Sequence, residues 1–222
     1  MKPLLIIANL KSNKTLSEAK DWLDEISNLK SQVSSLTNKE IIVCPSFIYL
    51  SIFKSFISEH GLPIRLGAQN ISRFSQGPYT GEVNGLQIKD FADYVIVGHS
   101  ERRGTFGEDE SVVEEKIKMS IDYNLIPIFC VQNDSDKIPQ EVSIVAYEPI
   151  FAIGTGSADT PENADNVAKK IREKADVDYV LYGGSVTVEN VKSFTSMENI
   201  NGVLVGNSSL DPLEFLKIIE NA

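Results

Sequence analysis

Lys11, His99 and Glu148 each lie at or just after the end of a short apolar run. A carboxylate can act as a general base, an imidazole can donate a hydrogen bond to a carbonyl oxygen, and an ammonium group can stabilise negative charge. If the fold brings the ends of these runs together, the three side chains predict a site that holds a base, a hydrogen-bond donor and a cation.

Glu148 is the candidate base because it stands between Tyr147 and Pro149, where partial burial would raise its pKa towards that of a usable base. The alternative is a structural salt bridge between Glu148 and Arg102 or Arg103. The sequence by itself leaves both interpretations open.

His99 is a candidate hydrogen-bond donor to a substrate carbonyl. Ser100 and Glu101 resemble the first residues of a helix, and the N-terminus of a helix disfavours an imidazolium ion, so a neutral imidazole is expected. The alternative is a polar residue that only ends a strand. The second histidine, His60, is interpreted as structural.

Several glycine-rich turns suggest an anion site. Backbone N–H groups at Gly154, Ser185, Gly206 and Asn207 could converge on a phosphate group, with Lys11 neutralising charge nearby. The alternative is that these glycines only make tight turns between strands and helices.

Eight apolar runs, separated in most cases by amphipathic segments, would have to position these residues. Runs without strict alternation are typical of parallel strands that are buried on both faces. Eight strand-helix units in 222 residues predict one closed (β/α)8 barrel, whose functional groups lie at the carboxyl ends of the strands. The runs are 3–9, 40–46, 64–70, 94–100, 126–132, 142–148, 178–184 and 202–207.

No linker divides the chain, so residues 1–222 are expected to form a single barrel domain. Only about ten residues separate the fifth run from the sixth, which predicts a shortened or missing helix there. An open doubly wound sheet is the alternative fold, although no G-x-G-x-x-G pattern follows the first run.

The amino-acid composition limits the kinds of partner that the protein can bind. A formal net charge of −10 argues against nucleic acid and anionic membranes, and no segment has the length and apolarity to span a bilayer. Cys44 and Cys130 each end an apolar run and are interpreted as buried free thiols, so a cytoplasmic protein is expected.

The chain resembles the triosephosphate isomerases over nearly its full length. The resemblance rests on blocks that occur in the family's order: NLKSN at 9–13, GAQN at 67–70, GPYTGE at 77–82, GHSERR at 98–103, AYEPIFAIGTG at 146–156, YGGSV at 182–186 and GVLVGNSSL at 202–210.

This resemblance implies interconversion of dihydroxyacetone phosphate and D-glyceraldehyde 3-phosphate in glycolysis and gluconeogenesis, without a cofactor or metal. Glu148 aligns with the family's base and His99 with its neutral electrophile. Asn9 and Lys11 align with groups that stabilise the enediolate and the phosphate, and Glu101 aligns with a supporting carboxylate.

Two further segments have implied roles. Residues 149–156 resemble a lid whose Gly154 amide closes on the phosphate beside Ser185, Gly206 and Asn207. The long polar stretch 69–85 resembles the loop by which one subunit of a homodimer inserts Thr80 next to its neighbour's catalytic residues.

The chain departs from the family pattern at four positions. Phe151 stands where the lid usually has tryptophan, Gln132 and Asn133 replace a glycine and a glutamate after the fifth strand, and Asn207 replaces a glycine of the eighth turn.

Two alternative functions remain. One is a pentose-phosphate epimerase, for which the expected acidic pairs or metal ligands are not found. The other is a catalytically silent phosphate-binding barrel.

Overall fold

The computed structural model of the protein describes residues 2–35, 38–152 and 158–222. Each of the eight apolar runs overlaps one β-strand. The strands are β1 (Leu4–Asn9), β2 (Lys39–Cys44), β3 (Ile64–Ala68), β4 (Tyr94–Val97), β5 (Ile126–Val131), β6 (Ile144–Tyr147), β7 (Tyr179–Tyr182) and β8 (Gly202–Val205).

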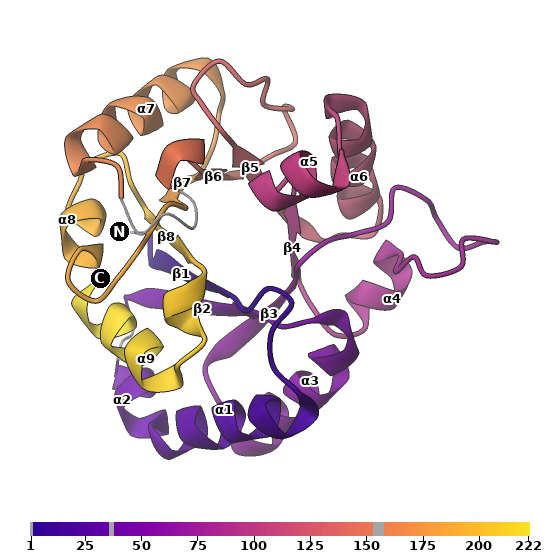
Figure 1. Ribbon diagram of the computed structural model, residues 1–222, viewed down its shortest axis with the longest axis vertical. Helices are drawn as coiled ribbons and strands as arrows, with labels where there is room; N and C mark the ends of the chain where they lie inside the picture. Colours follow the sequence, from indigo (N-terminus) through magenta and orange to yellow (C-terminus); the bar gives the residue numbers. More distant parts are fainter. Residues whose placement is uncertain (1, 36–37, 153–157) are drawn as a thin grey trace.

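All eight strands are parallel and follow one another around a closed barrel, in which β8 pairs again with β1 (Figure 1). The predicted (β/α)8 barrel is therefore confirmed. The open doubly wound sheet is wrong, because an open sheet has no pairing between its first and last strands. Closure brings all eight carboxyl ends to one face, which is where barrel enzymes place their reacting groups.

An outer ring of helices surrounds the barrel (Figure 1). The helices have local start signals in the sequence, such as the capping box of Thr15 with Glu18, or Pro161 after the N-cap residue Thr160. The α-helices in the described residues are α1 (Leu16–Asn28), α2 (Lys30–Ser35), α3 (Leu50–His60), α4 (Gly85–Lys89), α5 (Ser100–Phe106), α6 (Glu110–Asp122), α7 (Pro161–Lys174), α8 (Val191–Thr195) and α9 (Pro212–Asn221). None of them is long and apolar enough to cross a membrane.

The connection between β5 and β6 contains no helix, as its length predicted. A missing helix could leave part of the barrel wall thinly covered, but the strands on either side of this connection are well covered. Phe129, Val131 and Val145 are fully buried, because α6 and α7 pack against these strands and Ile138 packs against the same core. An opening of about 550 Å³ lies between α6 and residues 137–141.

The apolar core has two layers. The larger layer fills the space between the strands and the helices, and the smaller layer fills the inside of the barrel. Cys44 and Cys130 belong to the inner layer, where both are free thiols as predicted, and burial raises the pKa of each thiol.

Gly202 on β8 has no room for a side chain because the backbone of the neighbouring strand lies against it. Its φ is +145°, and an added Cβ would lie 2.0 Å from the carbonyl oxygen of Leu5 on the neighbouring strand β1. We expect Gly202→Ala to lower the free energy of unfolding by about 3 kcal/mol or more, measured as a lower urea midpoint.

Gly104 provides the matched control. It lies inside α5, and an added Cβ would meet nothing within 4 Å. Gly104→Ala should therefore leave the urea midpoint unchanged or raise it slightly, since alanine favours helix by about 1 kcal/mol. Equal midpoints for the two variants would contradict the packing argument.

Candidate active site

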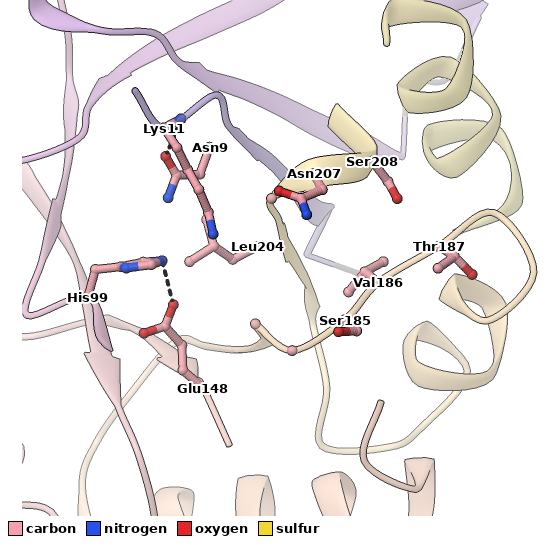
Figure 2. A pocket seen from close by; sticks show the side chains of 13 residues that line it. Asn9, Lys11, His99, Glu148, Ser185, Val186, Thr187, Leu204, Asn207 and Ser208 are labelled. Atoms are coloured by element: carbon pink, nitrogen blue, oxygen red, sulfur yellow. Dashed lines mark hydrogen bonds and ion pairs between the residues drawn. The ribbon is translucent and has the colours of Figure 1, made fainter. Parts of the chain in front are cut away.

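A cavity of about 160 Å³ opens at the carboxyl ends of the strands (Figure 2). It collects residues from β1, β4, β6, β7 and β8 that are far apart in the sequence. Its lining is formed by Asn9, Lys11, His99, Glu148, Gly183, Gly184, Ser185, Val186, Thr187, Leu204, Gly206, Asn207 and Ser208.

Glu148 is almost completely buried, with 1% of its surface exposed. One carboxylate oxygen lies 3.0 Å from His99 Nε2 (Figure 2). The other accepts a hydrogen bond of 2.8 Å from the backbone N–H of Ser100. The alternative salt bridge is wrong, because Arg102 pairs with Glu108 and Arg103 with Glu110.

His99 lies just after β4 and is the N-cap residue of α5, which begins at Ser100 as expected. Its Nδ1 accepts a hydrogen bond of 3.2 Å from the backbone N–H of Glu101. An imidazole that accepts at Nδ1 carries its proton on Nε2, so we assign the neutral tautomer whose Nε2–H donates to Glu148.

The charge state of His99 depends on its contact with Glu148. Burial lowers the pKa of His99, but the carboxylates of Glu148 and Glu101 together raise it more, so the pKa lies above its usual value. When Glu148 moves away from the imidazole, the largest upward influence is lost and burial favours the neutral form.

Lys11 is held in an uncommon backbone conformation with φ of 51°. Asn9 Oδ1 accepts the Lys11 N–H at 3.1 Å, while Ser46 Oγ and Gln69 Nε2 donate to the Lys11 carbonyl oxygen. The ammonium group reaches Glu101 at 2.6 Å. Gln69 thus has a positioning contact that the sequence motif alone did not reveal.

The candidate phosphate residues Ser185, Gly206 and Asn207 line the same cavity. Asn207 is not among the described residues with positive φ, so its side chain causes no strain where the family usually has glycine. Gly206 lies against Lys11, since an added Cβ would be 3.2 Å from the Lys11 side chain. Gly154 lies outside the described residues.

The chain after Glu148 is tied down at both described ends. Ser185 Oγ donates a hydrogen bond of 2.6 Å to the carbonyl oxygen of Ala152. The backbone N–H of Asp159 donates to the hydroxyl of Tyr182 at 2.8 Å, and Tyr147 donates to the Asp159 carboxylate at 3.3 Å. Burial raises the pKa of Tyr182 to about 12. Sequence reasoning missed these anchors because neither tyrosine has a charge or motif that marks it.

Thr80 does not line this cavity in its own chain. It is exposed and belongs to the polar segment 69–85, which projects from the barrel between β3 and α4 (Figure 1). Ser72 and Val83 close the base of this segment with a backbone hydrogen bond of 2.9 Å, and the rings of Phe74 and Tyr79 stack with centroids 4.2 Å apart.

Two of the four residues that depart from the family pattern lie in the turn after β5. The Gln132 N–H donates to Asp136, and Asn133 accepts from Ser135, so both residues bond within their own turn. Phe151 is 60% exposed.

A closed parallel barrel with acid–base side chains in a cavity at the carboxyl ends of its strands defines a (β/α)8-barrel enzyme architecture. The family model for triosephosphate isomerase matches residues 4–143 and 134–222. The two matches overlap across the helix-free connection between β5 and β6.

Curated relatives agree with this match. The chain is 35% identical to the triosephosphate isomerase of Dictyoglomus turgidum, with all of both chains covered. It is 37% identical to that of Dehalococcoides mccartyi, covering 100% of this chain and 97% of the relative, and 38% identical to that of Trichodesmium erythraeum, covering 99% of each. The chain belongs to the triosephosphate isomerase family, which confirms the expected enzyme class of intramolecular oxidoreductases.

Proposed function

We propose that the protein interconverts dihydroxyacetone phosphate and D-glyceraldehyde 3-phosphate through an enediolate, with Glu148 as the base and neutral His99 as the electrophile. The observation that carries this proposal is the 3.0 Å contact between Glu148 and His99 in a cavity that also holds Lys11. Family membership supports the same reaction.

Glu148 would remove a proton from the carbon next to the substrate carbonyl. The electrons of the broken C–H bond form the C=C bond of the enediolate, and negative charge develops on the former carbonyl oxygen. The Nε2–H of His99 would stabilise that oxygen and carry a proton between the two enediolate oxygens, after which Glu148 returns its proton to the other carbon. All electrons remain in the substrate, so no cofactor is required.

The cationic side of the site would stabilise the enediolate and the phosphate. Lys11 and Asn9 are assigned to these groups, and Glu101 supports Lys11 through its 2.6 Å ion pair. The backbone N–H groups of Ser185, Gly206 and Asn207 are assigned to the phosphate, together with Gly154 from the lid segment 149–156.

A coupled assay that follows formation of glyceraldehyde 3-phosphate tests the proposal. Rapid turnover of dihydroxyacetone phosphate is the expected result. No turnover, combined with measurable binding of inorganic phosphate, would favour the catalytically silent phosphate-binding barrel instead. Epimerisation of a pentose phosphate in a parallel assay would favour the other barrel enzyme.

We further propose that the protein is a homodimer in the cytoplasm and works in glycolysis and gluconeogenesis. A second hollow of about 270 Å³ adjoins the catalytic cavity and includes both Asn9 and Glu101 among its lining residues. Exposed apolar side chains lie at Ile48 and Phe106, the second of which also lines this hollow. Such a surface suits the projecting segment 69–85 of a second copy, with Thr80 reaching the catalytic residues.

Thr80→Glu is expected to weaken this dimer and make specific activity fall on dilution, because the added charge would enter the partner next to Glu101. Activity and sedimentation velocity, measured over the same dilution series, should decline together with the dimer fraction. Ser58→Glu is the matched control, since it adds the same charge to an exposed residue on α3. Full specific activity in a sample that sediments only as monomer would contradict the proposal.

A further inference from the structure

The cavity has few cationic groups for a substrate that carries a phosphate. Lys11 is the only lysine or arginine among its described lining residues, and Glu101 already engages the Lys11 ammonium at 2.6 Å. Glu148 places a carboxylate in the cavity itself. Neutral N–H and O–H donors must therefore supply much of the attraction for the phosphate.

Two of the side-chain donors in the lining are already occupied. Ser185 Oγ donates to the carbonyl oxygen of Ala152, and the Thr187 hydroxyl bonds to the Glu189 carboxylate, which lowers the pKa of Glu189. The carboxamide of Asn207, by contrast, has no hydrogen-bond partner among the described residues, although it lines the cavity. Its N–H groups are available to a ligand.

Asn207 is also held in place. It begins the short 3₁₀ turn η3 (Asn207–Ser209), whose Ser209 carbonyl oxygen accepts a hydrogen bond of 3.1 Å from the buried Trp22 indole. The preceding residue, Gly206, packs against Lys11. Figure 2 places Asn207 beside Ser208, on the side of the cavity away from His99 and Glu148. A donor on a fixed turn loses little freedom when it binds an anion.

We propose that the side-chain carboxamide of Asn207 is a specificity-determining donor for the substrate phosphate, in addition to the backbone N–H of the same residue. Its Nδ2–H group bonds to a phosphate oxygen and compensates for the pairing of Lys11 with Glu101. This inference rests on the proposed function for the identity of the phosphorylated substrate, but the anion contact itself can be measured without turnover.

Asn207→Ala is expected to weaken binding of inorganic phosphate about tenfold, because one hydrogen bond to a charged group is lost while the backbone N–H remains. Asn207→Asp, which keeps the shape but replaces the donor by a negative charge, should weaken it more. Isothermal titration calorimetry with inorganic phosphate measures both. Asn28→Ala and Asn28→Asp make the same changes on the exposed face of α1 and should leave phosphate binding as in the parent.

Kinetics separate a phosphate contact from a general structural effect. In Asn207→Ala the KM for D-glyceraldehyde 3-phosphate should rise about tenfold while kcat changes less than about threefold. Isomerisation of glyceraldehyde, which has no phosphate, should proceed at the parental kcat/KM. An equal loss with both substrates, or parental phosphate binding in Asn207→Ala, would overturn the inference.

The calorimetry also distinguishes this inference from the proposed reaction. If the parent protein binds phosphate and the Asn207 variants weaken that binding, the inference holds even when the coupled assay detects no turnover. If the parent isomerises triose phosphates but Asn207→Ala binds phosphate equally well, the reaction stands and the inference fails. A parent that binds no phosphate would overturn it as well.

Discussion

Glu148→Gln is expected to reduce kcat by more than about 10²-fold, because glutamine keeps the length and shape of the side chain but cannot accept a proton. The carboxamide oxygen can still accept the hydrogen bond from the Ser100 N–H, so the local fold should persist. The coupled assay measures kcat, and a phosphate-bearing enediolate mimic measures whether the site still binds.

Glu148→Asp tests whether the position of the carboxylate matters, because aspartate keeps the basic group but shortens the side chain. Shortening the side chain moves the carboxylate by about 1 Å, and such a displacement can reduce kcat by about 10²-fold, or roughly 2.7 kcal/mol at the barrier. Binding of the mimic should stay within about tenfold, because phosphate affinity is assigned to Lys11 and the turns at Ser185 and Gly206. Near-normal turnover in Glu148→Gln would mean that Glu148 is structural and that the proposed mechanism is wrong.

The Glu148→Gln protein should also change the titration of His99. Burial lowers the pKa of His99, and Glu148 provides the largest of the influences that raise it. Removing the carboxylate should therefore lower the pKa, so that the imidazolium forms only at a lower pH than in the parent. Proton NMR can follow this titration, because the chain has two histidines and His60→Gln assigns the second signal.

His99→Gln is expected to reduce kcat by about 10²-fold or more, because the enediolate oxygen loses the Nε2–H donor and the shuttle between the two oxygens. Binding of inorganic phosphate should change by less than about threefold, since no phosphate contact is assigned to the imidazole. This division between kcat and phosphate affinity is the expected signature of a group that acts on the reacting atoms.

His60→Gln is the matched control for this substitution. His60 is exposed at the end of α3, where its ring stacks on Phe56 at 3.9 Å and its Nδ1 contacts the Phe56 carbonyl oxygen at 2.9 Å. The substitution should leave kcat close to the parental value. A kcat above about half of the parental value in His99→Gln, or an equal loss in both variants, would contradict the proposed role of His99.

Much of the architecture could be predicted from the sequence. Parallel strands that are buried on both faces appear as apolar runs, and a barrel places whatever follows those runs on one face. Lys11, His99 and Glu148 could therefore be expected in one cavity, and the fold places them there. The helix-free connection between β5 and β6 was also predictable, because a chain of fixed rise per residue cannot fit a full helix into it.

Contacts between side chains were decided only by the tertiary structure. The sequence left Glu148 free to pair with an arginine. The fold directs it to His99 and the Ser100 N–H because the first residue of α5 comes within hydrogen-bonding distance of the residue that follows β6. Likewise, the pairing of Lys11 with Glu101 joins residues 90 positions apart. The apolar runs mark the strands and their order along the chain. The direction of each side chain depends instead on how neighbouring loops pack, and no local pattern in the sequence records that packing.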